Sequence, residues 1–320
     1  MSNRKPLSQN ILLSLGTLLF CLLMLEVGLR IYHGYVKMVS PYQPAEDPEM
    51  IYVVKPHIFR DVNSRGFRDR EHPLEKAPGS FRLLIIGDSV TRGYGVAPEE
   101  RYTDILQQRF IEDDQPYEVV NFGFDQYATV QETALLDEWG VPMRPDRVII
   151  SYVLNDPEPD GSINGFFLED RVASIAFYWL SKKLNQMMPA DSRESLEKEC
   201  HYFDYYSRLH CSPEKWQKVR QAFRKIRELS IRHDFPVLLV IFPVLSGDLE
   251  ATFSDYPWKD IHQRVLAEAK INGFETLDLL PYFAEYTPGM LKLNSHDALH
   301  PNPLGHRIAA DAIYEKLMTH

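Results

Sequence analysis

The sequence predicts a three-layer α/β/α fold with a mainly parallel sheet, preceded by one N-terminal transmembrane helix. Short apolar runs without polar alternation predict the sheet, because such runs are typical of strands buried on both faces. Amphipathic segments between these runs predict helices that cover the sheet. A nearly continuous apolar run close to the N-terminus predicts the separate helix.

Five apolar runs are expected to form strands. The first reads "RLLII", is too short for a helix and ends at Gly87. The expected strands are residues 82–86, 117–123, 146–156, 236–244 and 274–280.

Amphipathic segments alternate with these runs. In residues 212–233, Ser212 is a good N-cap and Pro213 suits the first helical position. Trp216 and Phe223 share one face of that segment. The other expected helices are residues 98–114, 130–140, 258–273 and a C-terminal helix that begins at Asn302-Pro303.

Composition excludes some partners. The chain has 320 residues, a formal net charge of −10 and a pI of about 5.6. An acidic surface repels phosphate backbones, so we do not expect a nucleic-acid partner. No segment repeats at a fixed period, which argues against solenoids and propellers.

The N-terminal segment is expected to be a signal anchor. Arg4 and Lys5 precede a run that is apolar from Ile11 to Leu25 and continues, with interruptions, to Ile31. That length reaches the roughly 20 residues that span a bilayer. A cleaved signal peptide is the alternative, but no small-residue cleavage site follows the run.

We therefore expect a single-pass membrane protein with most of its chain on the extracytoplasmic side. The expected division is a cytoplasmic end at 1–10, an anchor at 11–32, and a tether and lead-in at 33–80. Arg30 and Lys37 lie on the far flank of the anchor and weaken the charge asymmetry that would fix this orientation.

Residues 157–211 interrupt the alternation of strands and helices. One amphipathic helix is expected there, forming either a lid over a cleft or a plain packing helix. Its apolar face comprises Val172, Ile175, Ala176, Trp179 and Leu180. Cys200 and Cys211 are close enough in sequence to form a disulfide in an oxidising compartment, although two free thiols are the alternative.

Polar residues follow the expected strands and point to acyl-transfer chemistry. In parallel sheets, ligands bind beyond the carboxyl ends of the strands. A serine nucleophile needs a base, the base needs an orienting acid, and the oxyanion needs fixed donors. Candidates for these functions are Asp88, Ser89, Gly123, Asn155, Asp297 and His300.

Four short stretches resemble the blocks of the SGNH, or GDSL, hydrolase family, whose sheet is flavodoxin-like. They are "GDSVT", "NFG", "VLND" and "DALHPN", in the family's order and across residues 81–317. The resemblance implies a hydrolase domain at 81–320 that carries the 157–211 insertion.

The resemblance also implies the functions of single residues. Ser89 would be the nucleophile, His300 its base and Asp297 the acid that orients the imidazole. The backbone N–H groups of Ser89 and Gly123 and the amide of Asn155 would form the oxyanion hole. Such a site needs no metal and no cofactor.

Local sequence supports the histidine block and departs from the family at one position. Pro301 disfavours helical geometry at His300, and Asn302 is placed to cap the last helix. The third block often carries a glycine where this chain has Val153, which raises the question of cleft width. His296 beside Asp297 and His300 offers no third ligand for a metal.

The stretch "NSRGFRDRE" at 63–71 has two interpretations. Arg65 or Arg68 faces an anionic group of the substrate, or the segment is a lead-in that packs Phe67 on the domain.

The expected function is hydrolysis of carboxylic esters through an acyl-enzyme. O-acyl groups on envelope or exported glycans are the preferred substrates. An acyltransferase with the same triad and a lipid esterase or thioesterase are the alternatives. A non-catalytic glycan-binding protein ranks last, because none of the catalytic groups is missing.

Overall fold

The centre of the molecule is a five-stranded, fully parallel sheet with the strand order β4-β3-β5-β6-β7. The computed structural model describes residues 7–158, 174–177, 180, 183, 204–245 and 253–319. The strands of the sheet are β3 (Phe81–Gly87), β4 (Tyr117–Gly123), β5 (Arg147–Tyr152), β6 (Val237–Ile241) and β7 (Glu275–Asp278).

The strand order creates a crevice at one edge of the sheet. β3 lies between β4 and β5, so the chain leaves β3 toward one side of the sheet and later continues on the other. Gly87 pairs with Gly123 on β4 and with Ser151 on β5. The three strands therefore end at the same level, and the residues that follow them meet at a switch point of the kind that binds ligands.

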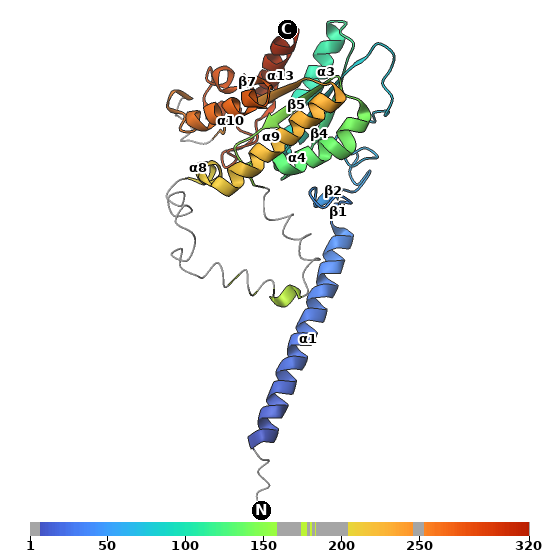
Figure 1. The fold of residues 1–320 in the computed structure, drawn as a ribbon, viewed down its shortest axis with the longest axis vertical. Helices are drawn as coiled ribbons and strands as arrows, with labels where there is room; N and C mark the ends of the chain where they lie inside the picture. Colours follow the sequence, from blue (N-terminus) through green and yellow to red (C-terminus); the bar gives the residue numbers. More distant parts are fainter. Residues whose placement is uncertain are drawn as a thin grey trace, which may run out of the picture.

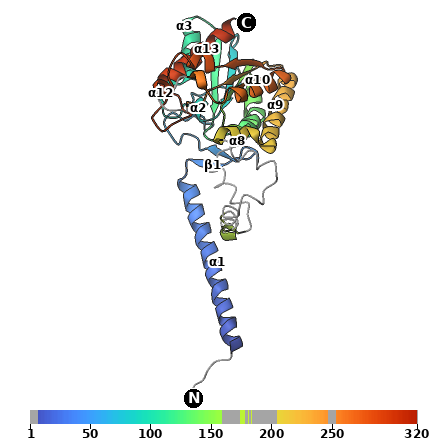
Figure 2. The ribbon, with the colours of Figure 1, turned by 90° about the vertical axis from the view of Figure 1, so that its left-hand side faces the viewer.

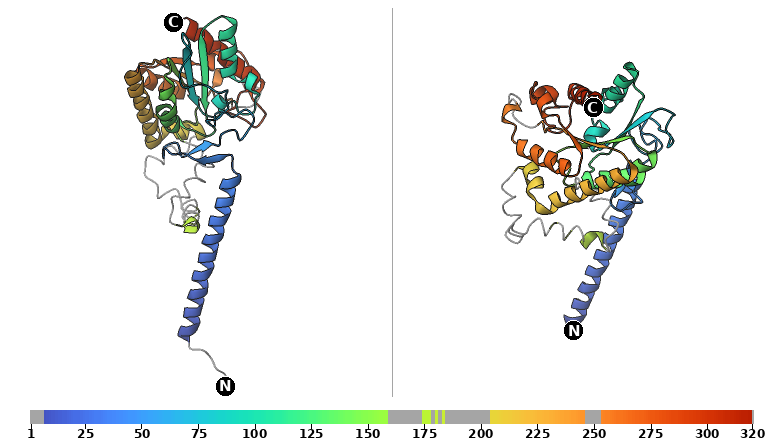
Figure 3. Two further views of the ribbon diagram at one scale, coloured as in Figure 1. Left: turned by 90° about the vertical axis from the view of Figure 1, so that its right-hand side faces the viewer. Right: turned by 45° about the horizontal axis from the view of Figure 1, so that its top comes forward.

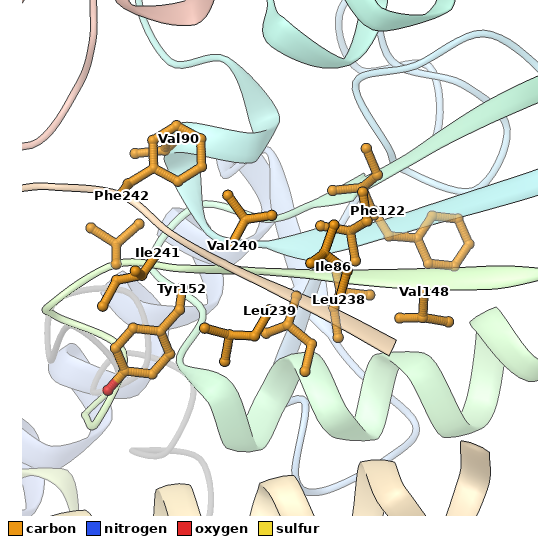
Figure 4. Packing of buried hydrophobic residues seen from close by; sticks show 14 of the residues in the cluster. Ile86, Val90, Phe122, Val148, Tyr152, Leu238, Leu239, Val240, Ile241 and Phe242 are labelled. Atoms are coloured by element: carbon orange, nitrogen blue, oxygen red, sulfur yellow. The ribbon is translucent and has the colours of Figure 1, made fainter. Parts of the chain in front are cut away.

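The apolar runs form strands because both faces of the sheet are covered. Residues 83–86 of β3 and all of β6 are buried. Figure 4 shows side chains of Ile86, Phe122, Val148 and Leu238 packed across neighbouring strands. Each such side chain contributes roughly 1.5–3 kcal/mol on burial.

Helices form a layer on each side of the sheet (Figure 3), which confirms the predicted three-layer fold. α3 packs on α13 over one face, and α4 packs on α9 over the other. The longer helices of the domain are α3 (Tyr102–Glu112), α4 (Thr129–Leu135), α8 (Tyr205–Cys211), α9 (Pro213–His233), α10 (Lys259–Ile271) and α13 (Pro303–Met318). The short ones are α2 (Ser89–Arg92), α11 (Leu280–Phe283) and α12 (Pro288–Leu291).

Some elements are shorter than their apolar runs suggest. The strand expected at 146–156 ends at Tyr152, because the next residues form a turn. In that turn the amide of Val153 donates to Asp156 Oδ2 at 3.1 Å, and the amide of Asp156 donates to the carbonyl of Val153 at 3.0 Å. The helix expected at 130–140 ends as α-helix at Leu135 and continues as a wider π-turn to Gly140.

α1 (Leu7–Val39) projects away from the domain (Figures 1 and 2). Its segment Ile11–Val39 contains an 18-residue window with a mean hydropathy of 2.2 and is long and apolar enough to cross a membrane. The helix continues past residue 32, through the start of the segment expected to be a tether. A two-stranded hairpin of β1 (Tyr42–Pro44) and β2 (Tyr52–Val54) follows it.

The lead-in before β3 packs on the domain. Phe67 is buried and stacks on Phe122 of β4, with ring centroids 3.9 Å apart. Arg68 pairs with Asp61 and donates to the carbonyls of Gly93 and Val96. These contacts favour the second interpretation of "NSRGFRDRE", a structural lead-in.

The insertion is described in part. Ile175, Ala176 and Leu180 of its expected helix are described, whereas Val172 and Trp179 lie outside the described residues. Cys211 is disulfide-bonded. Cys200, its expected partner, also lies outside the described residues, so this pairing stays a prediction.

Candidate active site

Ser89 is the first residue of α2, directly after β3 and at the switch point of the sheet. Asp88 caps α2 by accepting a hydrogen bond from the amide of Val90 at 2.9 Å. Gly87 is needed before them, because a Cβ there would lie 2.2 Å from Thr91 Oγ1. Ser89 opens the helix, so its N–H belongs to the first turn and has no acceptor within that helix.

Ser89, His300 and Asp297 form one chain of hydrogen bonds. Ser89 Oγ lies 2.8 Å from His300 Nε2. His300 Nδ1 lies 2.8 Å from Asp297 Oδ2. This is the geometry in which an imidazole removes a proton from a serine while a carboxylate fixes its tautomer.

The loop that carries His300 is held at several points. The carbonyl of His300 accepts from the amide of Leu293 at 3.0 Å, and the amide of Leu245 donates to the carbonyl of Ala298 at 2.7 Å. The Tyr94 ring packs on the imidazole, with centroids 4.5 Å apart. Asn302 caps α13 as the sequence predicts, accepting from the two amides after Pro303. The imidazole is therefore positioned before substrate arrives.

Asp297 is held as a carboxylate. Burial raises its pKa, but the amides of His300 and Leu299, 2.9 and 3.0 Å from Oδ1, and the imidazole outweigh that effect. The net result is a pKa below the usual range for aspartate. Asp297 is thus charged at neutral pH and can stabilise an imidazolium.

Asn155 follows β5 and lines the same cleft as Ser89. Its Nδ2 lies 3.3 Å from Asp88 Oδ2. One hydrogen of the amide is thereby directed to Asp88, which leaves the other for a bound oxyanion. The role of Asn155 as an oxyanion donor stays a prediction.

Gly123 corrects one expectation from the sequence. Its N–H donates to Asn121 Oδ1 at 2.8 Å, and it is not among the residues that line the cleft. A Cβ at Gly123 would lie 2.2 Å from the backbone nitrogen of Arg92, and Asn121 Nδ2 donates to the carbonyl of Thr91 at 2.8 Å. The "NFG" block therefore joins β4 to α2, and its glycine amide faces its own asparagine instead of the substrate.

Asp125 and Gln126 of this loop line the cleft and were not predicted from the sequence. The φ of Gln126, 59°, lies in the left-handed region that favours glycine. The amide of Phe124 donates to the carbonyl of Gly87 on β3, and the amide of Tyr127 donates to the carbonyl of Phe124. A glutamine gives no sequence signal of positive φ, so only its place after β4 pointed to it.

The cleft has a volume of about 540 Å³ and joins parts of the chain that are far apart. Three tyrosines line it: Tyr42 of β1, Tyr94 and Tyr206 of α8. The wall near the histidine loop includes Asn294 and His296. Nothing in the sequence pattern predicts that β1 or α8 reaches this site.

Three buried carboxyl groups lie behind the nucleophile. Burial raises the pKa of Asp88, Glu132 and Asp156, and their mutual repulsion raises those of Glu132 and Asp156 further. Within the described residues, neither carboxyl oxygen of Glu132 has a hydrogen-bond partner. Raised pKa values favour the protonated forms of these groups, and less negative charge behind Ser89 opposes a developing oxyanion less.

Val153 does not narrow the cleft. Its side chain is fully buried in the core and is absent from the cleft lining. Its φ is negative, so the backbone has no need of glycine at this position.

The comparisons with known proteins agree with this geometry. Residues 85–308 match the GDSL-like Lipase/Acylhydrolase family. The chain belongs to this family. The matched residues include Ser89, Asn155 and His300, so the family predicted from the four short blocks is confirmed. Family membership makes the protein an ester-hydrolysing enzyme.

Three solved structures are similar to this chain at low identity. The acetylxylan esterase Axe2 from Geobacillus stearothermophilus is 20% identical, with a TM-score of 0.47 over 75% of this chain and 95% of that chain. TesA is 16% identical, with a TM-score of 0.46 over 74% and 98%. The acetyl xylan esterase AlAXEase is 16% identical, with a TM-score of 0.46 over 74% and 100%. A comparison with curated proteins finds no match.

Proposed function

We propose that the enzyme hydrolyses carboxylic esters through an acyl-enzyme on Ser89. The observation that carries this proposal is the continuous chain Ser89 Oγ–His300 Nε2 and His300 Nδ1–Asp297 Oδ2, with 2.8 Å at each link. A serine hydroxyl is a weak nucleophile unless a base removes its proton as it attacks. His300 is the base within reach.

In the first half-reaction, Ser89 Oγ attacks the ester carbonyl and its proton passes to His300 Nε2. The imidazolium, stabilised by Asp297, then protonates the departing alkoxide, and the alcohol leaves. In the second half-reaction, water attacks the acyl-enzyme and gives its proton to His300. The carboxylic acid leaves and Ser89 regains its hydrogen.

The oxyanion in both half-reactions is stabilised by the N–H of Ser89, the side-chain amide of Asn155 and a backbone amide of the β4–α4 loop. The donor from that loop is assigned to Gln126, because it lines the cleft whereas Gly123 does not. Fixed donors of this kind act without reorganisation and are each worth about 10²–10³ in rate.

The substrates we propose are O-acyl groups on glycans of the cell envelope or on exported glycans. Tyrosine rings and polar side chains around the cleft suit a sugar better than a long acyl chain, which would need a deep apolar channel. α1 acts as a single membrane-spanning anchor, with the catalytic domain on the extracytoplasmic side. A Cys200–Cys211 disulfide fits an oxidising compartment.

The experiment that tests this proposal treats the full chain in detergent with a fluorophosphonate probe and maps the labelled residue by mass spectrometry. Label is expected on Ser89 and is expected to disappear in Ser89→Ala and His300→Ala. His296→Ala is the matched control, because His296 lies on the same loop and lines the same cleft. Full labelling of His300→Ala would refute the proposed base.

A further inference from the structure

The catalytic cleft lies beside the end of the anchor helix. α1 ends at Val39, and Tyr42, the first residue of β1, lines the cleft together with Ser89. Tyr42 also contacts Asp125 of the β4–α4 loop, with its hydroxyl 3.4 Å from Asp125 Oδ2. The chain thus passes from the anchor into the wall of the active site with almost no intervening segment.

Lys55 joins the anchor to the domain. Its Nζ donates to the carbonyls of Lys37, Met38 and Ser40, at 3.2, 3.0 and 2.7 Å. The last carbonyls of a helix lack partners and carry partial negative charge, so an ammonium group there stabilises the helix end. The backbone amide of Lys55 also donates to the carbonyl of Pro41 at 2.8 Å.

The hairpin that carries Lys55 is embedded in the domain. The three residues of β2 are buried, and the Tyr127 hydroxyl donates to the carbonyl of Tyr52 at 2.5 Å. The Tyr52 hydroxyl donates to the carbonyl of Asp125. The end of α1 is therefore fixed to the same loop that lines the cleft, and the anchor is a rigid mount for the domain.

The active-site edge of the sheet faces the anchor. α13 begins at Pro303, close to His300, and ends near the C-terminus, at the far end of the molecule from α1 (Figure 1). Figure 2 shows β1 and α8, which supply Tyr42 and Tyr206, on the side of the domain next to α1. A bilayer around α1 would thus lie on the same side as the cleft.

The insertion makes a second contact with the anchor. Glu26 of α1 accepts hydrogen bonds from the hydroxyl of Ser174 and from the amides of Ile175 and Ala176, at 3.0, 3.1 and 3.0 Å. A carboxylate within an apolar span is costly unless such donors satisfy it. Phe177 and Leu180, beside this contact, are 70% and 56% exposed in the absence of lipid. Their exposure fits a segment that rests in the membrane boundary.

We propose that the substrate is the ester-bearing head group of an amphiphile held in the same membrane as the enzyme. This inference rests on the proposed function and narrows its substrate class. The rigid mount keeps the cleft at the bilayer surface, where the head group enters the cleft while the apolar tail stays in the lipid. Confinement to one surface raises the effective concentration of such a substrate by about 10²–10⁴.

The test raises the cleft without turning it. Seven helix-forming residues inserted between Gly34 and Tyr35 lengthen α1 by about 10 Å. They add almost two full turns of helix, so the domain ends about 20° from its original orientation. The extended and unmodified chains are reconstituted in phosphatidylcholine vesicles. Two probes carry the same O-acetyl group: a hexadecyl glucoside in the vesicles and a methyl glucoside in solution.

The unmodified enzyme is expected to prefer the vesicle-held ester in kcat/KM by about 100-fold, and the extended enzyme to lose at least about tenfold of that preference. The rate on the soluble ester is expected to stay within about twofold. Lys55→Met, which loosens the mount, is expected to lose part of the preference. Lys218→Met on the exposed face of α9 is the matched control and is expected to lose none.

An unchanged preference in the extended enzyme, or no preference in the unmodified one, overturns the inference and leaves the proposed function intact. If neither ester is hydrolysed and the fluorophosphonate does not label the enzyme, the proposed function itself is refuted. Energy transfer from a fluorophosphonate dye on Ser89 to an acceptor lipid gives the height of the cleft without turnover. It is expected to fall in the extended enzyme, and equal transfer in both enzymes contradicts the rigid mount.

Discussion

A substitution of Asn155 is expected to impair catalysis while leaving the fold intact. Asn155 lines the cleft, and its contact with Asp88 is a single hydrogen bond of 3.3 Å. Replacing it by alanine should lower kcat by about 10²–10³ and leave KM within a few-fold, because the amide acts on the oxyanion and not on the bound ester. Hydrolysis of p-nitrophenyl acetate measures both constants. A large rise in KM with kcat unchanged would show that Asn155 only binds substrate.

Gln126 and Gly123 form a matched pair for testing which loop residue faces the substrate. Gln126→Gly should raise the free energy of unfolding by about 0.5–1 kcal/mol, because glycine accepts a φ of 59° without strain. Activity should be retained, since the backbone amide remains. Gly123→Ala should destabilise the enzyme strongly, because the new Cβ would lie 2.2 Å from the Arg92 nitrogen. Urea unfolding checks both, and a Gly123→Ala enzyme that is stable but inactive would restore the original assignment.

The buried carboxyl group of Glu132 makes the free energy of unfolding depend on pH. Its folded-state pKa is raised by burial and by Asp88, so the folded chain keeps a proton that the unfolded chain releases above about pH 4.3. Its contribution to stability is therefore complete below that pH and declines by about 1.4 kcal/mol per pH unit until the folded-state pKa is reached. Glu132→Gln should make the decline between pH 5 and 8 less steep. Urea unfolding across this range measures the slope, and an unchanged slope would contradict the raised pKa.

At the scale of elements, the start of α13 connects the last helix to catalysis. Asn302 caps the helix and also donates from Nδ2 to the carbonyl of Met290 at 2.8 Å. Asn302→Ala should cost about 1 kcal/mol of stability and lower kcat several-fold, because the loop that carries His300 loosens. Asn302→Ser keeps a cap and should recover most of the stability. Thermal unfolding and steady-state kinetics distinguish the two variants, and equal losses in both would mean that the cap does not position the loop.

Elements that depend on local pattern were predictable from the sequence, and contacts that depend on tertiary packing were not. Apolar runs predicted the strands. The blocks at the strand ends predicted Ser89, Asn155, Asp297 and His300 as site residues. The "NFG" block misled because the acceptor of a backbone N–H, here Asn121 Oδ1, is decided by how β4 meets α2. Tyr42 and Tyr206 carry no sequence signal at all, since only the packing of β1 and α8 brings them to the cleft.

At the scale of the whole molecule, one edge of the sheet serves two purposes. The switch point between β4 and β5 assembles the catalytic groups, and the hairpin after α1 closes the cleft beside them. Lys55 joins that hairpin to the last carbonyls of α1, and in the arrangement we propose α1 and the active site move as one unit. In this proposal, substrate access depends on how the whole chain sits in the membrane as well as on the cleft.

The proposed mechanism requires Ser89 to carry the acyl group during turnover. Acid quenching of the enzyme during steady-state hydrolysis of p-nitrophenyl acetate, followed by peptide mass mapping, tests this requirement. We expect an acetyl group on Ser89, and neither acetylation nor turnover in Ser89→Ala. Continued turnover by Ser89→Ala, or turnover of the unmodified enzyme with no acetyl group on Ser89, would contradict it.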